Sequence, residues 1–598
     1  PGSGGYNMSR YFWKVLPICF LLIGLQVHAQ DWIDMHSQNL QMITDADTKQ
    51  AQNVLWSLEQ LRTEFGHIFN RGKLYRNRPI IVFGLRNAAE LKSFAGPQTT
   101  SDGGFAISTP DCNFLVLDVS SNDWSAIYRA YTLLLLNANY PKTHPWFDEG
   151  IAQTLAGFSV NDKQATLGPS PETSRILQSG SLIPVGQLIQ PGVQQTPEFR
   201  ATAWLVLRWM LEGNQLEAAA QYFSHVMLQH TPPEQAFEQS FSISPSALDA
   251  ALVKFKASAL SPKHIDVPAG IDRLSFVSTK LTSTDAQAYK ARFHLAFPNE
   301  RADALADLRN LLANNHDSVI VNRALGYGYL LDGNLKSAAD FIRRAIELRD
   351  NDGQMHFLLA VYYNQGNNSS IQVDSAVPSI LLQTDKALAI DPELSDAYVL
   401  MAQAQRSMQR PDLAAKSMNK AMTMRPRDEN LLLTFASIQA ENSKYNDAKS
   451  LLGFLQQSSD KNVAQRATEL LASIDTERKN ERKWANKAYV DPTEDRWKPT
   501  KAADDKSATD VEPAESKIDT RKTEYLKGTL ASVSCSDKGA TLKVVSAKRV
   551  WTFNVADRSK TILIGADSFE CGWHAVPVSV NFKSSGGLQG DIVSLEID

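Results

Sequence analysis

The sequence predicts a multidomain protein with an α+β domain, an all-α array of repeated helix pairs and a small all-β barrel at the C-terminus. A chain of 598 residues is too long for one hydrophobic core, so several domains are expected. Alanine and proline recur at fixed spacings in the middle of the chain, which indicates repeats. The last stretch, 525–598, consists of short runs that alternate apolar and polar residues, as strands do.

The composition limits the class of partner. With 43% apolar and 21% charged residues, the chain has the balance of a soluble globular protein. A formal net charge of -4 argues against a nucleic-acid partner, because such partners are bound by basic surfaces.

Residues 1–29 have the pattern of upstream residues followed by a signal peptide. Arg10 and Lys14 precede an apolar run at 15–25, and small residues lead up to Ala29. We expect cleavage after Ala29 and an exported protein, periplasmic or secreted. No later stretch is long and apolar enough for a membrane span, so none is expected after cleavage.

Residues 30–262 alternate strand and helix patterns and are assigned to the α+β domain. After a first strand, helices are expected at 45–65, 88–94, 199–212, 215–230 and 244–257, and buried strands at 79–84, 105–108 and 113–119. Two more helices are expected within 123–157, the first running to Leu136 and capped by Asp123 or Ser125. The second begins near Trp146 and stops at Gly157.

The second of these helices carries a specific motif. Its seven residues read W-F-D-E-G-I-A, starting at Trp146 and including Glu149 and Gly150. They resemble the W-x-x-E-G-x-A helix of the peptidase-MA-like group of gluzincin metallopeptidases. In that family the preceding helix carries HExxH, and the glutamate of the second helix is the third zinc ligand. The resemblance implies a gluzincin-like fold for this domain.

The zinc-binding residues of the first helix are missing. Aligned on the family, Arg129 stands at the first histidine, Ala130 at the catalytic glutamate and Leu133 at the second histidine. A guanidinium and an isobutyl group offer zinc no lone pair, and a methyl group cannot accept a proton from water. Only Glu149 remains. We therefore predict a pseudoenzyme with no metal and no cofactor, and His144 in the intervening loop would need a second histidine to replace the lost ligands.

Arg129 is predicted to take the place of the ion. In the zinc-bound fold the first histidine and the glutamate converge on one metal, so Arg129 and Glu149 should face each other. The planar guanidinium suits a carboxylate, and the two are expected to form a salt bridge between the helices.

Residues 283–488 resemble a tetratricopeptide repeat array ending in a capping helix at 463–488. Ala338 with Ala345, and Ala414 with Ala421, sit seven apart, as in the second helix of that motif. Copies are expected at 284–315, 325–348 and 431–457, with an insertion at 367–376. The resemblance implies an unknown protein or peptide partner on the concave face. Four tyrosines on first helices are candidates for that face, or for packing between repeats: Tyr327, Tyr329, Tyr362 and Tyr363.

Residues 489–524 are charged and nearly free of aliphatic side chains, so a disordered linker is expected there. The six strands expected within 525–598 suggest a small barrel, either SH3-like or OB-like. Cys535 and Cys571 can pair in an oxidising compartment, whereas Cys112 is expected to be a buried apolar residue.

Three functions remain open. The first is an exported pseudopeptidase that acts as a scaffold or as a peptide- or protein-binding adaptor through its repeats. The second is a hydrolase with a non-zinc or rebuilt metal site in the same cleft. The third is a cell-envelope glycan-binding protein that uses the C-terminal barrel.

Overall fold

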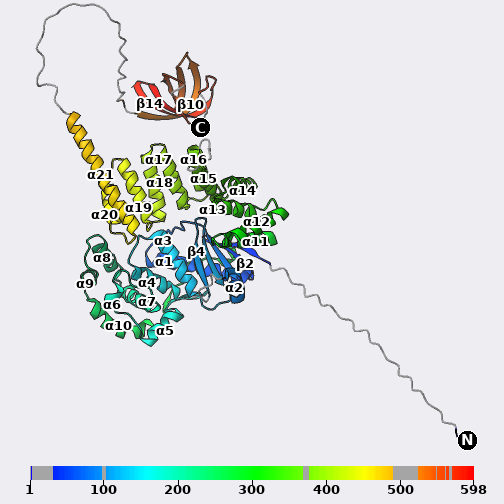
Figure 1. Cartoon of the computed structure of the whole chain (residues 1–598), viewed down its shortest axis with the longest axis vertical. Helices are drawn as coiled ribbons and strands as arrows, with labels where there is room; N and C mark the ends of the chain where they lie inside the picture. Colours follow the sequence, from blue (N-terminus) through cyan, green and yellow to red (C-terminus); the bar gives the residue numbers. More distant parts are fainter. Residues whose placement is uncertain are drawn as a thin grey trace, which may run out of the picture. The chain divides into compact units, whose positions relative to one another are not determined.

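The chain forms two units, residues 1–490 and 491–598, and each is described by itself (Figure 1). Apart from Gly2, the computed structural model describes residues 31–96, 103–367 and 376–488, and residues 521–597 without 522, 547–548, 559–560 and 565–568. The predicted signal peptide, all but the two end residues of the predicted insertion at 367–376, and nearly all of the predicted linker lie outside these residues. None of the helices in the described residues has the length and apolar character needed to span a membrane.

A mixed six-stranded sheet lies at the centre of the first unit. Its strands, in spatial order, are β4 (Gly104–Ser108), β5 (Asn113–Asp118), β3 (Ile80–Leu85), β2 (Gln41–Thr44), β1 (Ile33–His36) and β9 (Val277–Lys280). Strands β2, β3 and β5 are parallel, with Ile81 of β3 opposite Gln41 and Phe114. The other three pairings are antiparallel.

Helices cover both faces of this sheet, which explains why β3 and β5 are apolar runs without alternation. Val82 of β3 belongs to the cluster that contains helices α1 (Thr48–Ile68) and α3 (Ser125–Asn139). Its neighbours Ile81 and Phe83 belong to the cluster on the other face. That cluster also takes in α2 (Ala88–Ala95) and Phe293 of α11 (Ser283–His294), so the first helix of the repeat region is part of the core of the α+β region.

The rest of the α+β region is helical, with one small three-stranded sheet. The helices are α4 (Pro145–Ala156), α5 (Pro171–Ser179), α6 (Val185–Leu188), α7 (Pro197–Glu212), α8 (Leu216–Met227), α9 (Pro233–Phe241) and α10 (Pro245–Ala259). The small sheet has the order β6 (Phe158–Val160), β7 (Ala165–Leu167), β8 (Lys263–Ile265). A short 3-10 turn, η2, covers Arg273–Ser275. Sequence reasoning missed the helices α5, α6 and α9, the strands β6 to β9, and one strand of the β1–β2 hairpin.

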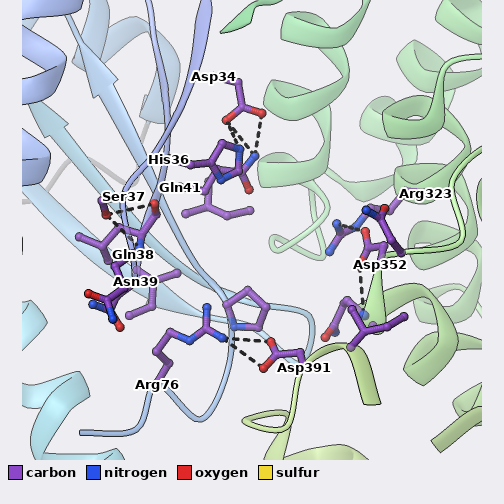
Figure 2. Close-up of a pocket in the computed structure, with 18 of the residues that line it drawn as sticks. Asp34, His36, Ser37, Gln38, Asn39, Gln41, Arg76, Arg323, Asp352 and Asp391 are labelled. Carbon is purple, nitrogen blue, oxygen red and sulfur yellow. Dashed lines mark hydrogen bonds and ion pairs between the residues drawn. The ribbon is translucent and has the colours of Figure 1, made fainter. Parts of the chain in front are cut away.

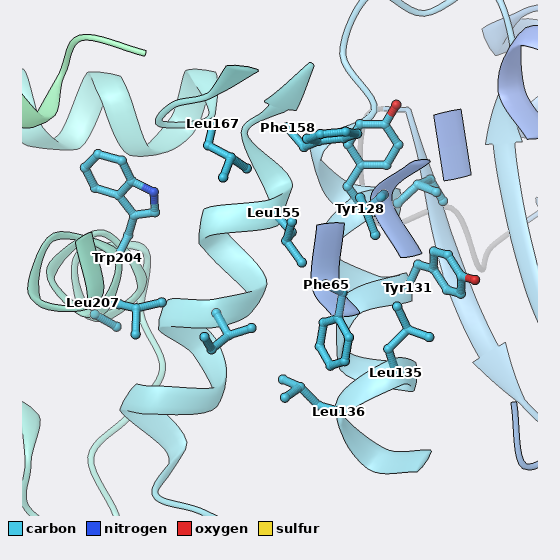
Figure 3. Close-up of a cluster of buried hydrophobic side chains, with 14 of the residues drawn as sticks. Phe65, Tyr128, Tyr131, Leu135, Leu136, Leu155, Phe158, Leu167, Trp204 and Leu207 are labelled. Carbon is cyan, nitrogen blue, oxygen red and sulfur yellow. The ribbon is translucent and has the colours of Figure 1, made fainter. Parts of the chain in front are cut away.

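Helices α3, α4 and α7 pack around one apolar cluster, in which Trp204 and Leu207 of α7 lie on the far side of α4 from Leu135 and Leu136 (Figure 3). Gly150 permits the close approach of α4 and α7, because a Cβ there would lie 2.9 Å from the Ala203 carbonyl oxygen. The predicted cap of α3 is wrong: Trp124 occupies the cap position, and Asp123 Oδ1 instead accepts the Ser125 N–H.

Five helix pairs and a long final helix follow. The pairs are α11 with α12 (Arg301–Asn314), α13 (Val319–Leu331) with α14 (Leu335–Leu348), α15 (Gly353–Asn367) with α16 (Ala376–Ile390), α17 (Ser395–Ser407) with α18 (Pro411–Met424), and α19 (Glu429–Glu441) with α20 (Tyr445–Leu455). Helix α21 spans Lys461–Ala488. The alanines that identified the repeats are fully buried, and Gly326 meets Ile342 so closely that a Cβ would not fit. Small side chains thus allow the helices of each pair to approach closely.

The second unit is a closed five-stranded barrel with one extra short strand. Its strands are β10 (Thr523–Cys535), β11 (Ala540–Ser546), β12 (Arg549–Val555), β13 (Ile562–Ile564), β14 (Val576–Gly586) and β15 (Gln589–Ile597). The order β12-β11-β10-β14-β15 closes through a parallel pairing of β12 with β15, and β13 adds to β15. A disulfide joins Cys535 and Cys571 across 36 positions of sequence.

Candidate functional site

The site that the family resemblance predicts lies between α3 and α4, which pack side by side in the first unit. Pro145 starts α4, and proline suits the first turn because it lacks an N–H that would be unpaired there. The helix stops at Gly157, where a Cβ would collide with the Gly168 carbonyl oxygen. These two limits place Glu149 in the second turn of α4, facing α3.

Arg129 and Glu149 form a bidentate salt bridge between the two helices. The Arg129 Nε donates to Glu149 Oε1 at 2.6 Å, and Nη2 donates to Oε2 at 2.7 Å. The Glu149 side chain is 3% exposed, whereas that of Arg129 is 31% exposed. The carboxylate is therefore almost fully excluded from solvent, while the guanidinium reaches the surface. Both oxygens of Glu149 accept hydrogen bonds from Arg129.

A chain of buried hydrogen bonds continues from Glu149. Gln153 Nε2 donates to Glu149 Oε1 at 2.9 Å, and Thr173 Oγ1 donates to Gln153 Oε1 at 3.2 Å. Ser170 Oγ donates to Thr173 Oγ1 at 3.0 Å. All four side chains belong to the buried polar residues of this region. Oε1 of Glu149 thus accepts from both Arg129 and Gln153, and the chain helps to fix the orientation of the carboxylate.

The electrostatics around Arg129 favour its charged form. The hydrogen bond from Arg129 to Glu149 raises the pKa of the guanidinium, although burial acts against this. The Glu172 carboxylate adds a smaller attraction, and it is itself bonded to Arg200 at 3.1 Å. This position therefore carries a permanent positive charge.

Ala130 and Leu133, which the family resemblance aligns with the catalytic glutamate and the second histidine, have no side-chain atom that can bind a metal. Ala130 and Leu133 are half-buried, and Leu133 packs against the main apolar cluster. In the described residues, no three His, Cys, Asp or Glu side chains gather where they could hold one metal ion.

His144 lies at the N-cap of α4 and is not directed to a ligand cluster. Its Nδ1 is buried without a hydrogen-bond partner among the described residues. Burial lowers the pKa of His144 to about 4, against the opposing attraction of Asp148. This histidine is therefore neutral at physiological pH.

The four candidate tyrosines of the repeats have different surroundings. Tyr327 is only 4% exposed and belongs to the core cluster of the repeats, and burial raises its pKa, so of the two alternatives it fits packing and not the concave face. It faces the α+β region because its own helix packs there, near Asp111. Tyr329 stacks on Phe341 at 5.6 Å. Tyr362 and Tyr363 are half-buried neighbours, with the Arg343 guanidinium 5.5 Å from the Tyr362 ring.

Sequence reasoning missed the junction between the α+β region and the repeats. Arg76 bonds Asp391 at 3.1 Å and Glu393 at 3.3 Å, both in the turn between α16 and α17. Arg78 bonds Asp396 at 2.7 Å at the start of α17. The α+β region thus contacts the array at the turns between helix pairs. Charged residues in these turns can be recognised in the sequence, but the residues that they bond lie some 300 positions away along the chain. The sequence alone therefore did not reveal these contacts.

A second part of the junction is buried. Asp111 lies between Arg292 of α11 and Arg323 of α13, and its side chain is 1% exposed. Burial raises its pKa, but the two guanidinium groups outweigh that effect and hold the pKa below its usual value. The neighbouring Cys112 is free and buried, and burial raises its pKa to about 12. Its thiol is therefore unreactive, in agreement with the expected apolar role.

No protein-family model matches this sequence, and no curated protein matches it. Several solved tetratricopeptide repeat proteins are similar in structure. YrrB, described as a TPR protein with an unusual peptide-binding site, is 15% identical with a TM-score of 0.26, over 31% of this chain and 91% of that chain. TTC0263 of Thermus thermophilus, a thermophilic TPR protein, is 13% identical with a TM-score of 0.27, over 31% and 99% of the two chains.

PilF of Pseudomonas aeruginosa is 15% identical with a TM-score of 0.27, over 33% of this chain and 90% of that chain. Each likeness covers about a third of this chain. The array itself is defined by its helix pairs, its buried alanines and its turns.

Proposed function

We propose that this chain is an exported pseudopeptidase, a gluzincin-like domain without zinc chemistry, which serves as an adaptor for a protein or peptide bound by its repeats. The observation that carries the proposal is the bidentate pair of Arg129 with Glu149. An arginine in the place of the first histidine satisfies the remaining ligand residue internally. The two helices are then held together without the ion and without its reactivity.

The contacts of the array with the α+β region lie apart from a groove that could bind a partner. The contacts of Asp391, Asp396 and Arg427 with the α+β region come from turns or helix starts. A groove of about 390 Å³ farther along the array is lined by α17, α19 and α21. Its lining residues are Arg406, Leu433, Thr434, Ser437, Arg466, Glu469, Leu470 and Ser473. This mixture of apolar, hydroxyl and charged side chains suits an extended peptide.

Zinc content and partner capture test the two halves of the proposal. The protein purified without residues 1–29 should contain far less than one zinc per chain after incubation with equimolar zinc, and should cleave no peptide in a chelator-sensitive manner. Elemental analysis near one zinc per chain would refute the pseudopeptidase assignment.

For the repeats, Thr434→Arg places a large side chain in the groove, and Thr423→Arg places the same side chain on the exposed surface of α18. A partner captured from periplasmic extract by the wild-type protein should be lost with Thr434→Arg and kept with Thr423→Arg. Equal capture by both variants would remove this groove from consideration.

The same proposal includes the barrel type. In the order β10-β11-β12-β15-β14, only the β12–β15 pairing is parallel, and β14 returns to β10. This five-stranded Greek-key closure supports the OB-like alternative over the SH3-like one.

A further inference from the structure

A polar cavity of about 420 Å³ lies at the junction of the α+β region and the repeat array. Figure 2 shows the β1–β2 hairpin on one side and helices of the array on the other. The walls come from the hairpin, the segment before β3, Tyr289 of α11, Arg323 of α13 and the turns at 349–354 and 390–391. Its volume is that of a site for a small molecule.

Each carboxylate in the wall of this cavity is already bonded to a neighbouring wall residue. Gln41 Nε2 donates to both oxygens of Asp34 at 3.1 and 3.0 Å, and His36 Nε2 lies 3.0 Å from the same group. Arg76 Nη2 donates to both oxygens of Asp391 at 3.1 and 3.2 Å (Figure 2).

The third carboxylate, that of Asp352, accepts from Arg323 Nη1 at 2.6 Å and from the Gln354 N–H at 3.0 Å. The three carboxylates of the cavity wall are thus all bonded to other wall residues.

Several donors of the wall have no such partner. Arg349, at the C-terminus of α14, forms no ion pair among the described residues, although it lines the cavity. The Arg323 Nε is buried and has no hydrogen-bond acceptor in the same part of the chain. His36 uses one ring nitrogen for Asp34, and its electrostatic interaction with Arg349 places these two groups near each other. Arg349 and Asn351 are exposed, so a ligand can reach them from solvent.

We propose that this cavity binds a small oxyanion, a carboxylate or a phosphate, on a molecule the size of a dipeptide or a sugar phosphate. Arg349 supplies the principal charge, because its guanidinium can donate two parallel hydrogen bonds to one oxyanion. His36 offers a further donor, and Asn351 offers an amide for the uncharged part of the ligand. A metal cation is disfavoured there by the guanidinium groups of Arg76, Arg323 and Arg349.

The position of the cavity gives binding a structural consequence. A ligand held by both His36 and Arg349 would bridge the hairpin of the sheet and the turn between α14 and α15. Binding to the folded state alone raises the melting temperature as ligand is added. The ligand therefore reinforces the junction, independently of what the groove of α17, α19 and α21 binds.

Calorimetric titration of the chain without residues 1–29 tests the proposal, with inorganic phosphate and succinate as probes at low ionic strength. Saturable binding of at least one probe is expected, with a rise in melting temperature, and sodium chloride of equal ionic strength should produce neither. Binding of phosphate alone assigns the site to phosphate esters, and binding of succinate alone assigns it to carboxylates. No saturable heat with either probe at 10 mM or so would overturn the proposal.

Two variants locate the site. Arg349→Gln removes the unpaired guanidinium and should weaken binding about 10- to 100-fold, the effect of losing charge-assisted hydrogen bonds. Asn351→Asp adds a carboxylate to the lining, which should compete with the ligand and weaken binding to a similar degree. Lys336→Gln, which removes one exposed charge from α14 outside the cavity, is the matched control and should bind as the wild type does. Unchanged affinity in Arg349→Gln, with a normal circular dichroism spectrum, would exclude this cavity.

Discussion

Arg427 of the repeat array forms a bidentate salt bridge with Asp148, the residue immediately before Glu149 in α4. Its Nη1 and Nη2 donate to the two oxygens of Asp148 at 2.5 and 2.9 Å, and its Nε donates to the Tyr140 carbonyl oxygen at 2.9 Å. Thr143 also donates its hydroxyl to Asp148. The helix that carries Glu149 is thus bonded directly to a turn of the repeats.

Replacing Arg427 by Met should loosen this junction. Asp148 and Arg427 are mostly buried, with side-chain exposures of 16% and 13%, so the variant leaves a carboxylate with too few donors. A loss of about 1–3 kcal/mol in the free energy of unfolding of the first unit is expected in urea titrations. Arg410→Met breaks an exposed pair with Asp412 on the array and serves as the control, with little effect expected. Equal stability of the two variants would show that Arg427 does not hold the junction.

The Arg129–Glu149 pair predicts an asymmetric mutant cycle. Arg129→Met leaves the nearly dry Glu149 charge uncompensated and should cost about 3–5 kcal/mol of unfolding free energy. Glu149→Gln should cost less, because Arg129 reaches solvent and can be hydrated. The double variant Arg129→Met, Glu149→Leu should recover much of the larger loss. If the double variant is as unstable as the sum of the two single changes, the pair contributes no coupling energy.

Introducing the HExxH residues tests whether α3 and α4 have the metal-site geometry that the family resemblance implies. The triple variant Arg129→His, Ala130→Glu, Leu133→His places two imidazoles one helical turn apart on α3, facing Glu149. It should take up about one zinc per chain, measured by elemental analysis after dialysis. A variant with Glu149→Gln added removes the third ligand and should bind zinc at least tenfold more weakly. Equal uptake by the triple and quadruple variants would mean that Glu149 is not in a ligand position.

His144 gives the first unit a pH-dependent stability. In the unfolded chain it takes up a proton near pH 6.5, but in the folded chain only near pH 4, because burial disfavours the charged ring. The neutral ring therefore contributes fully to the free energy of unfolding above pH 6.5. This contribution is lost as the pH falls towards 4, by up to about 2–3 kcal/mol.

The difference in unfolding free energy between the wild type and His144→Gln should show this slope. The hydrogen bond to Asp34 raises the pKa of His36, so the contribution of His36 to stability changes with pH in the opposite direction. Both proteins contain His36, so its contribution cancels when the two free energies are subtracted. Thr423→Ser, an exposed control without a titratable group, should give a flat difference. A flat difference for His144→Gln as well would mean that this ring is hydrated in the folded protein.

The disulfide should stabilise only the second unit. It closes a loop of 36 positions, for which chain entropy gives about 3–4 kcal/mol. Cys535→Ser together with Cys571→Ser should lower the unfolding free energy of the barrel by that amount, and a reducing agent should do the same to the wild type. The unfolding transition of the first unit, whose Cys112 is free, should not move. A shift of both transitions on reduction would contradict this assignment.

Local elements were predictable because the spacing of apolar residues reports burial. The predicted strand 79–84 and helix 88–94 lie within a residue of β3 and α2, and the six predicted strands of the barrel are all present. Helix α9 was missed because its pattern is short, with Phe237 and Phe241 as its main buried residues.

The partners of charged and aromatic residues were harder to predict. The contact between Arg129 and Glu149 could be predicted because the family resemblance implied that these two helix positions lie close together. Nothing comparable connected Arg427 with Asp148, or Tyr327 with the α+β region. Periodicity shows that a side chain is buried, but it does not show which distant element buries it.

The contacts between the turns and the α+β region also change how the array exchanges its amide protons with solvent. In a free-standing array each helix pair contacts only its neighbours, so pairs can open one after another from an end. Here the turns before α17 and α19 are fixed to Arg76 and Asp148, and α11 shares the core of the central sheet. Opening of the pairs that make these contacts also breaks bonds with the α+β region, so we expect the helices from α11 to α19 to open more cooperatively than those of a free-standing array.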